Sequence, residues 1–117
     1  MAIYTITTRK DFEEKVLQNQ KVVLVDFWAS WCPPCVAMTP HLYAASEELD
    51  DTVDIVKINI EDTPENEENR QIAAEQDVQS IPNMPIFIDG KEAQRLIGFT
   101  PKPQLIEILT NLSKARR

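Results

Sequence analysis

The feature that most constrains the fold is a short apolar segment followed almost directly by a pair of cysteines. Lys21–Trp28 is nearly all apolar and β-branched, which predicts a strand that is buried on both faces. Cys32 and Cys35 come next, and the apolar residues after them recur at helical spacing. A strand that leads into a Cys-x-x-Cys pair at the start of a helix indicates an α/β protein with a redox-active dithiol.

The rest of the chain alternates between strand and helix patterns. Strands are predicted over Ile3–Ile6, Lys21–Trp28, Val53–Ile60, Met84–Ile88 and Ala93–Ile97, and helices after Thr8, Cys32, Thr63 and Thr100. This βαβαβαββα order predicts a mostly parallel sheet covered on both faces, with an antiparallel hairpin at one edge. At 117 residues and 43% hydrophobic composition, we expect one domain over residues 1–117.

The first helix has a clear start and an apolar stripe. Thr8 is the predicted N-cap and Asp11 occupies the capping-box position. Phe12, Val16 and Leu17 are predicted to form the face that packs on the sheet.

The spacing of the two cysteines predicts their chemistry. At a helix start they lie on one face, one turn apart, with Cβ atoms about 5–6 Å from each other, which is close enough for a disulfide. The free N–H groups and the positive end of the helix dipole stabilise a thiolate at Cys32. Cys32 is therefore predicted to attack a disulfide, and Cys35 to resolve the mixed disulfide that results.

Other uses of the pair are disfavoured. A structural zinc site needs four ligands, and the chain has two Cys and one His, so we expect no metal. A bridge over two intervening residues closes too short a loop to stabilise the fold much.

The composition bears on partners and location. A net charge of −7 argues against nucleic acid and anionic membranes as partners. Since a membrane-spanning run and a secretory signal are both missing from the pattern, we expect a cytoplasmic protein.

Asp26 interrupts the strand that precedes the cysteines, and two interpretations stand. Buried, its carboxyl would have a raised pKa and could accept a proton from Cys35 during exchange. Alternatively, it points to solvent at the end of the strand.

Several motifs together resemble the thioredoxin family over nearly the whole chain. The block from Val25 to Cys35 is similar to the family's active-site block, and Ile81-Pro82 to its cis-proline loop. Lys57–Glu61 is similar to the family's strand whose lysine lies near the buried Asp. The resemblance implies a thioredoxin fold: a mixed five-stranded sheet in the order 1-3-2-4-5, flanked by four helices.

The resemblance also implies roles for the matching residues. Cys32 would be the nucleophile, Cys35 the resolving thiol, Asp26 the proton acceptor and Lys57 the residue that tunes it. A surface would bind extended substrate segments, with Ile81 pairing through its backbone; its residues are Trp31, Pro33, Pro34, Ile81, Pro82 (in cis), Gly98 and Phe99. The implied activity is reduction of disulfides in proteins by a monomer, recharged by thioredoxin reductase, with the Cys32–Cys35 disulfide as redox centre and no bound cofactor.

Some residues depart from the family pattern. Gly is common at the position of Pro33, and Pro removes one backbone donor while stiffening the turn. Phe99 is bulkier than usual beside the substrate groove, and Thr63–Ser80 is longer than in short bacterial members, with a weakly apolar helix expected to lie on the surface. Pro85 predicts a bulge or an unpaired position in its strand. His41 is interpreted as an exposed residue without a catalytic role.

Two alternatives to a general reductase stay open. Cys-Pro-Pro-Cys also occurs in tryparedoxin and nucleoredoxin, which suggests a dedicated redox protein of one pathway. The second alternative is a binding module with secondary redox activity, which would use the surface of Trp31, Ile81 and Phe99.

Overall fold

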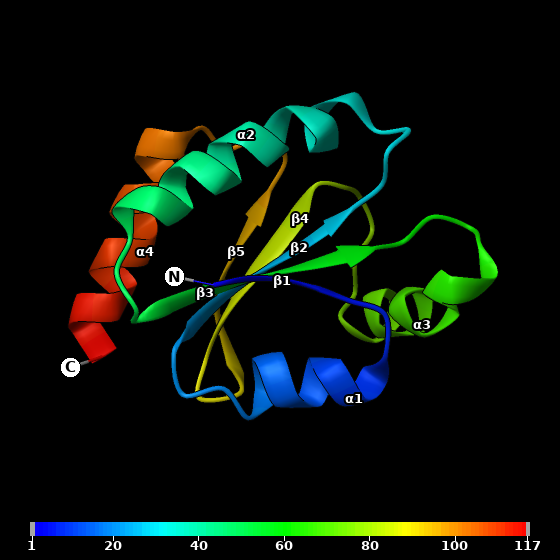
Figure 1. Cartoon of the computed structure of the whole chain (residues 1–117), viewed down its shortest axis with the longest axis horizontal. Helices are drawn as coiled ribbons and strands as arrows, with labels where there is room; N and C mark the ends of the chain where they lie inside the picture. Colours follow the sequence, from blue (N-terminus) through cyan, green and yellow to red (C-terminus); the bar gives the residue numbers. More distant parts are fainter. Residues whose placement is uncertain (1, 117) are drawn as a thin grey trace.

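The computed structural model describes residues 2–116 and confirms the predicted order of elements (Figure 1). The elements in chain order are β1 (Ile3–Ile6), α1 (Arg9–Phe12), a π-helical turn η1 (Glu13–Leu17), β2 (Val22–Trp28), α2 (Pro33–Glu48), β3 (Val53–Asn59), a 3₁₀ turn η2 (Pro64–Asn66), α3 (Glu67–Glu75), β4 (Asn83–Ile88), β5 (Lys91–Ile97) and α4 (Lys102–Arg116). The sheet order is β1-β3-β2-β4-β5, as the family resemblance implied. β1, β3 and β2 run parallel, whereas β4 and β5 are antiparallel to their neighbours.

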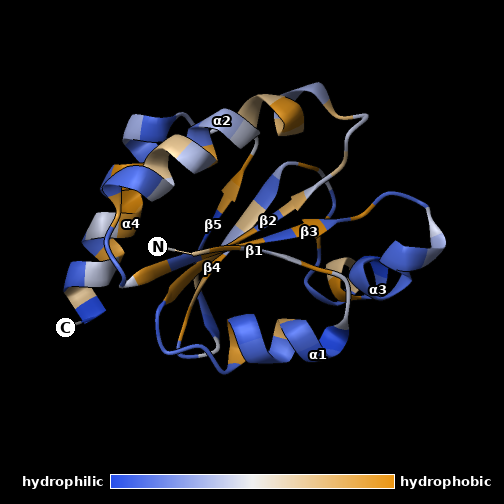
Figure 2. Ribbon diagram, in the orientation of Figure 1, coloured by the Kyte–Doolittle hydropathy of each residue, from blue (hydrophilic) through white to orange (hydrophobic). Residues whose placement is uncertain are grey.

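Helices cover both faces of the sheet. α2 and α4 lie on one face, and α1 and α3 lie on the other (Figure 1). β2 contributes alternate residues to two cores, because Val23, Val25 and Phe27 join the cluster under α1 and α3, whereas Val22 and Leu24 join the cluster under α2 and α4. β2 is accordingly largely apolar, whereas the outer faces of α1 and α3 are polar (Figure 2). The prediction of a strand buried on both faces is confirmed.

The first helix differs from its prediction at the C-terminal end. Thr8 is the N-cap, and its Oγ1 accepts the N–H of Asp11 at 3.1 Å. Phe12 and Val16 are buried, but Leu17 is 37% exposed, so its assignment to the buried stripe was wrong. The reason is the π-turn η1: the N–H of Gln18 bonds to Glu13 O, and this wider turn changes the direction of the last side chains.

The segment between β3 and β4 packs more deeply than its composition suggested. Ile72 and Ala73 of α3 are buried in the core, so the prediction of a surface helix was wrong for this face. Asn69 is also fully buried, and its Nδ2 donates to the carbonyls of Ile6 and Asn59. These bonds join α3 to β1 and β3, an attachment that an apolar-residue count does not detect.

The closing hairpin turns at Asp89 and Gly90, which both have positive φ (51° and 78°). This turn is tighter than predicted, because β5 begins at Lys91 rather than Ala93. A register shift between Ile86 and Phe87 lies next to Pro85, which has no N–H for the ladder. The irregularity predicted from Pro85 is therefore present. Among residues 2–116, the longest helices fall short of what a bilayer crossing requires.

Candidate active site

The two cysteines form a disulfide at the N-terminus of α2, with Cα atoms 5.2 Å apart. Cys32 is the N-cap, and its Sγ accepts the N–H of Cys35 at 3.3 Å. Pro33 and Pro34 occupy the first turn, where an N–H would lack an intrahelical acceptor in any case. The Cys35 N–H is therefore the helix donor that reaches Cys32, and it is in place to stabilise a thiolate there.

The loop before β4 faces the disulfide. The Ile81–Pro82 peptide bond is cis, as predicted, and the carbonyl oxygen of Ile81 lies 3.7 Å from Cys32 Sγ. Pro82 O in turn accepts the N–H of Gly98 at 2.9 Å. Residues that are far apart in the sequence, Cys32, Ile81, Pro82 and Gly98, therefore meet at one place.

The surface around the disulfide is apolar and open. Trp31 is 67% exposed and Phe99 46% exposed. A pocket of about 430 Å³ opens beside Cys32 and is lined by Trp31, Cys32, Pro33, Ile60, Val78, Gln79, Ser80 and Ile81. Such a surface suits an extended protein segment, because it offers apolar contacts beside the backbone of the Ile81–Pro82 loop.

Asp26 lies inside the protein, which excludes the interpretation that it faces solvent. It is 1% exposed, and neither carboxylate oxygen has a hydrogen-bond partner among residues 2–116. Burial raises the pKa of Asp26 to about 6, and the positive charge of Lys57 offsets part of this rise. Asp26 and Lys57 are register partners on β2 and β3. An isolated carboxyl of this kind can exchange a proton near neutral pH.

Lys57 is also buried, and its ammonium group contacts Thr39 and Trp28. Its Nζ donates to Thr39 Oγ1 at 3.4 Å and lies 4.6 Å from the ring centroid of Trp28. The structure thus brings Asp26, Lys57 and Trp28 together at the end of β2 that leads to the cysteines.

Comparison with known proteins agrees with this arrangement. The thioredoxin family model matches residues 3–111. The chain belongs to the thioredoxin family. It is 38% identical over 104 residues to the thioredoxin of Rickettsia bellii, a match that covers 89% of this chain and 93% of the relative. It is 41% identical over 98 residues to the thioredoxin of Porphyra purpurea (84% and 86%) and 38% identical over 109 residues to that of Staphylococcus epidermidis (93% and 96%).

Family membership and the disulfide establish the class of activity. The protein is a thiol–disulfide oxidoreductase that acts on protein disulfides, and thioredoxins need no bound cofactor for this. Thioredoxins generally act on disulfide-containing substrates and are reduced by thioredoxin reductase. Within residues 2–116, no group of three or more His, Cys, Asp and Glu side chains is placed to hold a metal ion.

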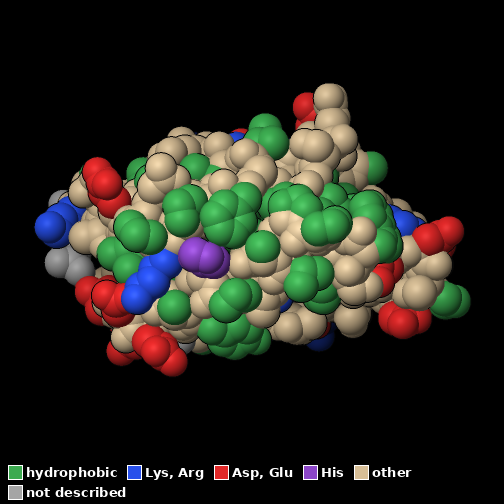
Figure 3. All heavy atoms as spheres, turned by 90° about the horizontal axis from the view of Figure 1, so that it is seen from above, with side chains coloured by type: hydrophobic (Ala, Val, Ile, Leu, Met, Phe, Trp, Pro, Cys, Tyr) green, Lys and Arg blue, Asp and Glu red, His purple; other side chains and the backbone are tan. Residues whose placement is uncertain are grey.

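The environment of His41 differs from the one predicted. This side chain is half-buried: its Nδ1 accepts the N–H of Lys102 at 2.9 Å, and its ring meets Phe99 edge-on at 5.0 Å between centroids. In Figure 3 the chain's single histidine is visible at the surface, between a basic side chain and hydrophobic side chains. Its interpretation as an exposed residue was wrong. The bonded partner is 61 positions away in the chain, so local pattern carries no signal for it.

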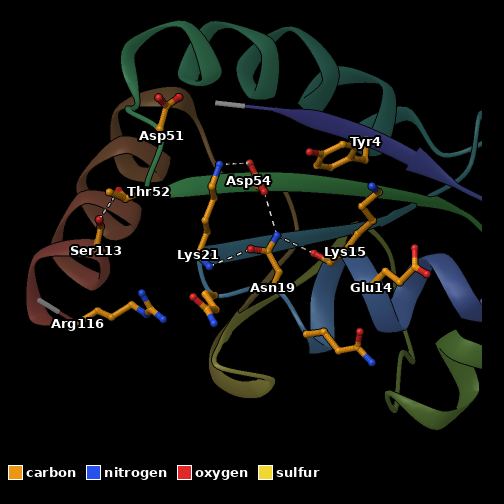
Figure 4. Close-up of a pocket in the computed structure, with 12 residues that line it drawn as sticks. Tyr4, Glu14, Lys15, Asn19, Lys21, Asp51, Thr52, Asp54, Ser113 and Arg116 are labelled. Atoms are coloured by element: carbon orange, nitrogen blue, oxygen red, sulfur yellow. Dashed lines mark hydrogen bonds and ion pairs between the residues drawn. The ribbon is translucent and has the colours of Figure 1, made fainter.

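Another hollow, of about 640 Å³, lies at the opposite end of the strands (Figure 4). It is bordered by the start of β3, the end of η1 and the last turn of α4, whereas the disulfide follows the end of β2. Polar side chains line it, and Asp54, Asn19 and Lys21 bond to one another there. These bonds connect the segment before β2 to the start of β3, so the polar groups of the hollow stabilise the fold.

Proposed function

We propose that this chain is a general reductase of protein disulfides that works through a Cys-Pro-Pro-Cys variant of the thioredoxin site. The observation that carries the proposal is the position of Cys32, which caps α2, accepts the Cys35 N–H and lies beside the Ile81 carbonyl at an open apolar pocket. This position combines thiolate stabilisation with access for an extended substrate.

The proposed reaction has two exchange steps. In the reduced protein, the Cys32 thiolate attacks one sulfur of the substrate disulfide, whose S–S bond breaks and whose other sulfur leaves as a thiolate and takes up a proton. The Cys35 thiolate then attacks Cys32 Sγ, releases the second substrate thiol and closes the Cys32–Cys35 disulfide. Two electrons pass from the protein to the substrate, and thioredoxin reductase returns two electrons to the protein.

Asp26 is proposed to accept the proton of Cys35 before the second step. Its burial supports this role, because a pKa of about 6 lets the carboxylate act as a base near neutral pH. Lys57 is proposed to limit the rise of that pKa through its charge.

The substrate segment is proposed to bind to the surface around Cys32. The residues of this surface are Trp31, Pro33, Pro34, Ile81, Pro82, Gly98 and Phe99. Their arrangement around Cys32 supports this assignment, with the backbone of Ile81 as the pairing edge and the neighbouring side chains as apolar contacts. We further propose that residues 1–117 work as one monomeric domain in the cytoplasm, where the protein would carry electrons for redox homeostasis.

The test is the reduction of insulin disulfides with NADPH and thioredoxin reductase, together with the redox potential against glutathione. Rapid turnover and a strongly reducing potential support a general reductase. A reversible disulfide without turnover would instead indicate a dedicated pathway. Full biological activity of the Cys32→Ser, Cys35→Ser double variant would indicate a binding module.

A matched pair of variants tests the order of the two steps. Cys35→Ser should retain the attack by Cys32 and accumulate a mixed disulfide with the substrate, which mass spectrometry detects. Cys32→Ser should form none and should lower turnover by at least about a thousandfold. Accumulation with Cys32→Ser in place of Cys35→Ser would reverse the assignment of the two cysteines.

A further inference from the structure

The segment from β5 to α4 is held in place by two side chains of α2. His41 Nδ1 accepts the N–H of Lys102, the first residue of α4. Prolines 101 and 103 flank Lys102 and have no N–H, so the Lys102 N–H is a first-turn donor that needs an outside acceptor. The imidazole therefore caps α4 from a different helix.

Met38 provides the second attachment. It lies one turn before His41, on the same side of α2, and its Sδ accepts the N–H of Thr100 at 3.2 Å. The start of the segment is bonded to the cis-proline loop through the Gly98 N–H and Pro82 O. Three bonds thus hold residues 98–102 between α2 and the loop that faces Cys32.

Phe99 is the one residue in the middle of this segment that projects into solvent. Thr100 is buried, whereas Phe99 stays 46% exposed with its ring edge-on to His41. Because its neighbours on both sides are bonded, the backbone of Phe99 is held beside the cis-proline loop, and the contact with His41 orients its ring. An exposed aromatic ring whose backbone is held in this way is pre-organised for binding.

We propose that Phe99 is a specificity-determining residue and that His41 is its positioning residue, so that the protein prefers disulfides flanked by a bulky apolar side chain. The inference rests on the proposed function, in which the substrate segment pairs with Ile81. In an extended segment the residues two positions from the cysteine point to the same face, about 7 Å along the strand. One of them would meet Phe99, which follows the residue bonded to Pro82.

Two peptide disulfides test the preference. They differ only in a Phe or a Ser two residues from the cysteine, placed on either side in separate pairs. The reduced protein is mixed with each peptide, and the rate is followed through tryptophan fluorescence. The wild type should react about five- to tenfold faster with the Phe peptide of one pair, an effect at the low end for apolar recognition. Phe99→Ala should lower this ratio to less than about twofold, because it slows the reaction with the Phe peptide more than the reaction with the Ser peptide.

The variants of His41 separate positioning from general stability. His41→Leu removes the acceptor for Lys102 and should reduce the ratio as far as Phe99→Ala does. His41→Asn offers Oδ1 as an acceptor and should keep more than half of the preference. Leu17→Ala is the matched control and should leave the ratio unchanged, because Leu17 is an exposed apolar residue of η1, which directly follows α1 on the other face of the sheet. Hydrogen exchange of the Lys102 amide should be faster in His41→Leu alone.

Each outcome has one meaning. Glutathione disulfide serves as a small substrate without an apolar side chain. If the wild type reduces neither it nor the peptides, the proposed function is wrong. If it reduces all of them but shows no preference in either pair, the inference alone is wrong. A preference that survives in Phe99→Ala or in His41→Leu would overturn the role of that residue.

Discussion

Two buried carboxylates on neighbouring strands show how differently the two ends of this molecule are built. Asp26 on β2 is 1% exposed and has no hydrogen-bond partner among residues 2–116. Asp54 on β3 is 3% exposed, and it accepts bonds from the Ala2 N–H and from Asn19 Nδ2 and pairs with Lys21 Nζ (Figure 4).

The two carboxylates have different roles in one sheet: Asp54 stabilises the structure, whereas Asp26 is placed to exchange a proton. A buried carboxylate with three partners is stabilised as an anion and ties its neighbours together. A buried carboxylate without a hydrogen bond is costly to ionise, and this cost keeps its proton exchangeable near neutral pH. The end of the sheet near Asp26 carries the disulfide, and the end near Asp54 carries the bonded polar hollow.

The largest expected effect concerns exchange at the Asp26 end. Asp26→Asn should slow closure of the Cys32–Cys35 disulfide at pH 7 by at least about a hundredfold, because a general base is lost. Stopped-flow fluorescence measures the step. The control is Asp54→Asn, which should exchange at the wild-type rate. Equal rates for the wild type and Asp26→Asn would remove Asp26 from the mechanism.

The same substitution should make the protein more stable. The folded-state pKa of Asp26, about 6, exceeds the ordinary value of 3.8, so the folded state binds more protons between these values and the free energy of unfolding falls as pH rises through this window. Asp26→Asn should therefore raise that free energy by about 3 kcal/mol above pH 6 and by almost nothing below about pH 4. Urea unfolding at several pH values measures this. An equal gain at all pH values would contradict the linkage.

Asp54→Asn should have the opposite sign. The amide loses the ion pair with Lys21 and places an N–H₂ group among donors, so we expect the free energy of unfolding to fall by about 2 kcal/mol at pH 7. Urea unfolding of both variants under the same conditions measures the two changes in the free energy of unfolding. A gain in stability for both variants would mean that the bonds of Asp54 contribute less free energy than the burial of its charge costs.

The smallest effect is expected at the rim of the polar hollow. Arg116 pairs with Asp89 at the surface, where both side chains are partly exposed. Arg116→Ala should lower the free energy of unfolding by about 0.5 kcal/mol or less, and 1 M salt should remove most of that difference. Thermal unfolding at two salt concentrations checks this. A loss comparable to that of Asp54→Asn would show that this surface ion pair contributes as much to the free energy of unfolding as the buried carboxylate does.

Much of this architecture follows from local pattern. Two-sided burial of β2 follows from its apolar run, and the turn of the hairpin from Gly90 and its neighbours. Leu17 was misassigned because a helical stripe assumes constant rotation per residue, and η1 breaks that assumption. α3 was assigned to the surface because it has few apolar residues, yet its Asn69 donates to two strand carbonyls inside the protein.

The sequence alone determined the order of strands and helices and the dithiol at Cys32 and Cys35, because these depend on periodicity and on spacing within one helical turn. The tertiary structure alone decided that Asp26 is buried, without a hydrogen bond to any of the residues from 2 to 116, and that His41 holds the segment carrying Phe99. Both of these properties arise from contacts between elements that are remote in the chain. They depend on how the helices pack over the sheet, and that geometry is set by the whole fold.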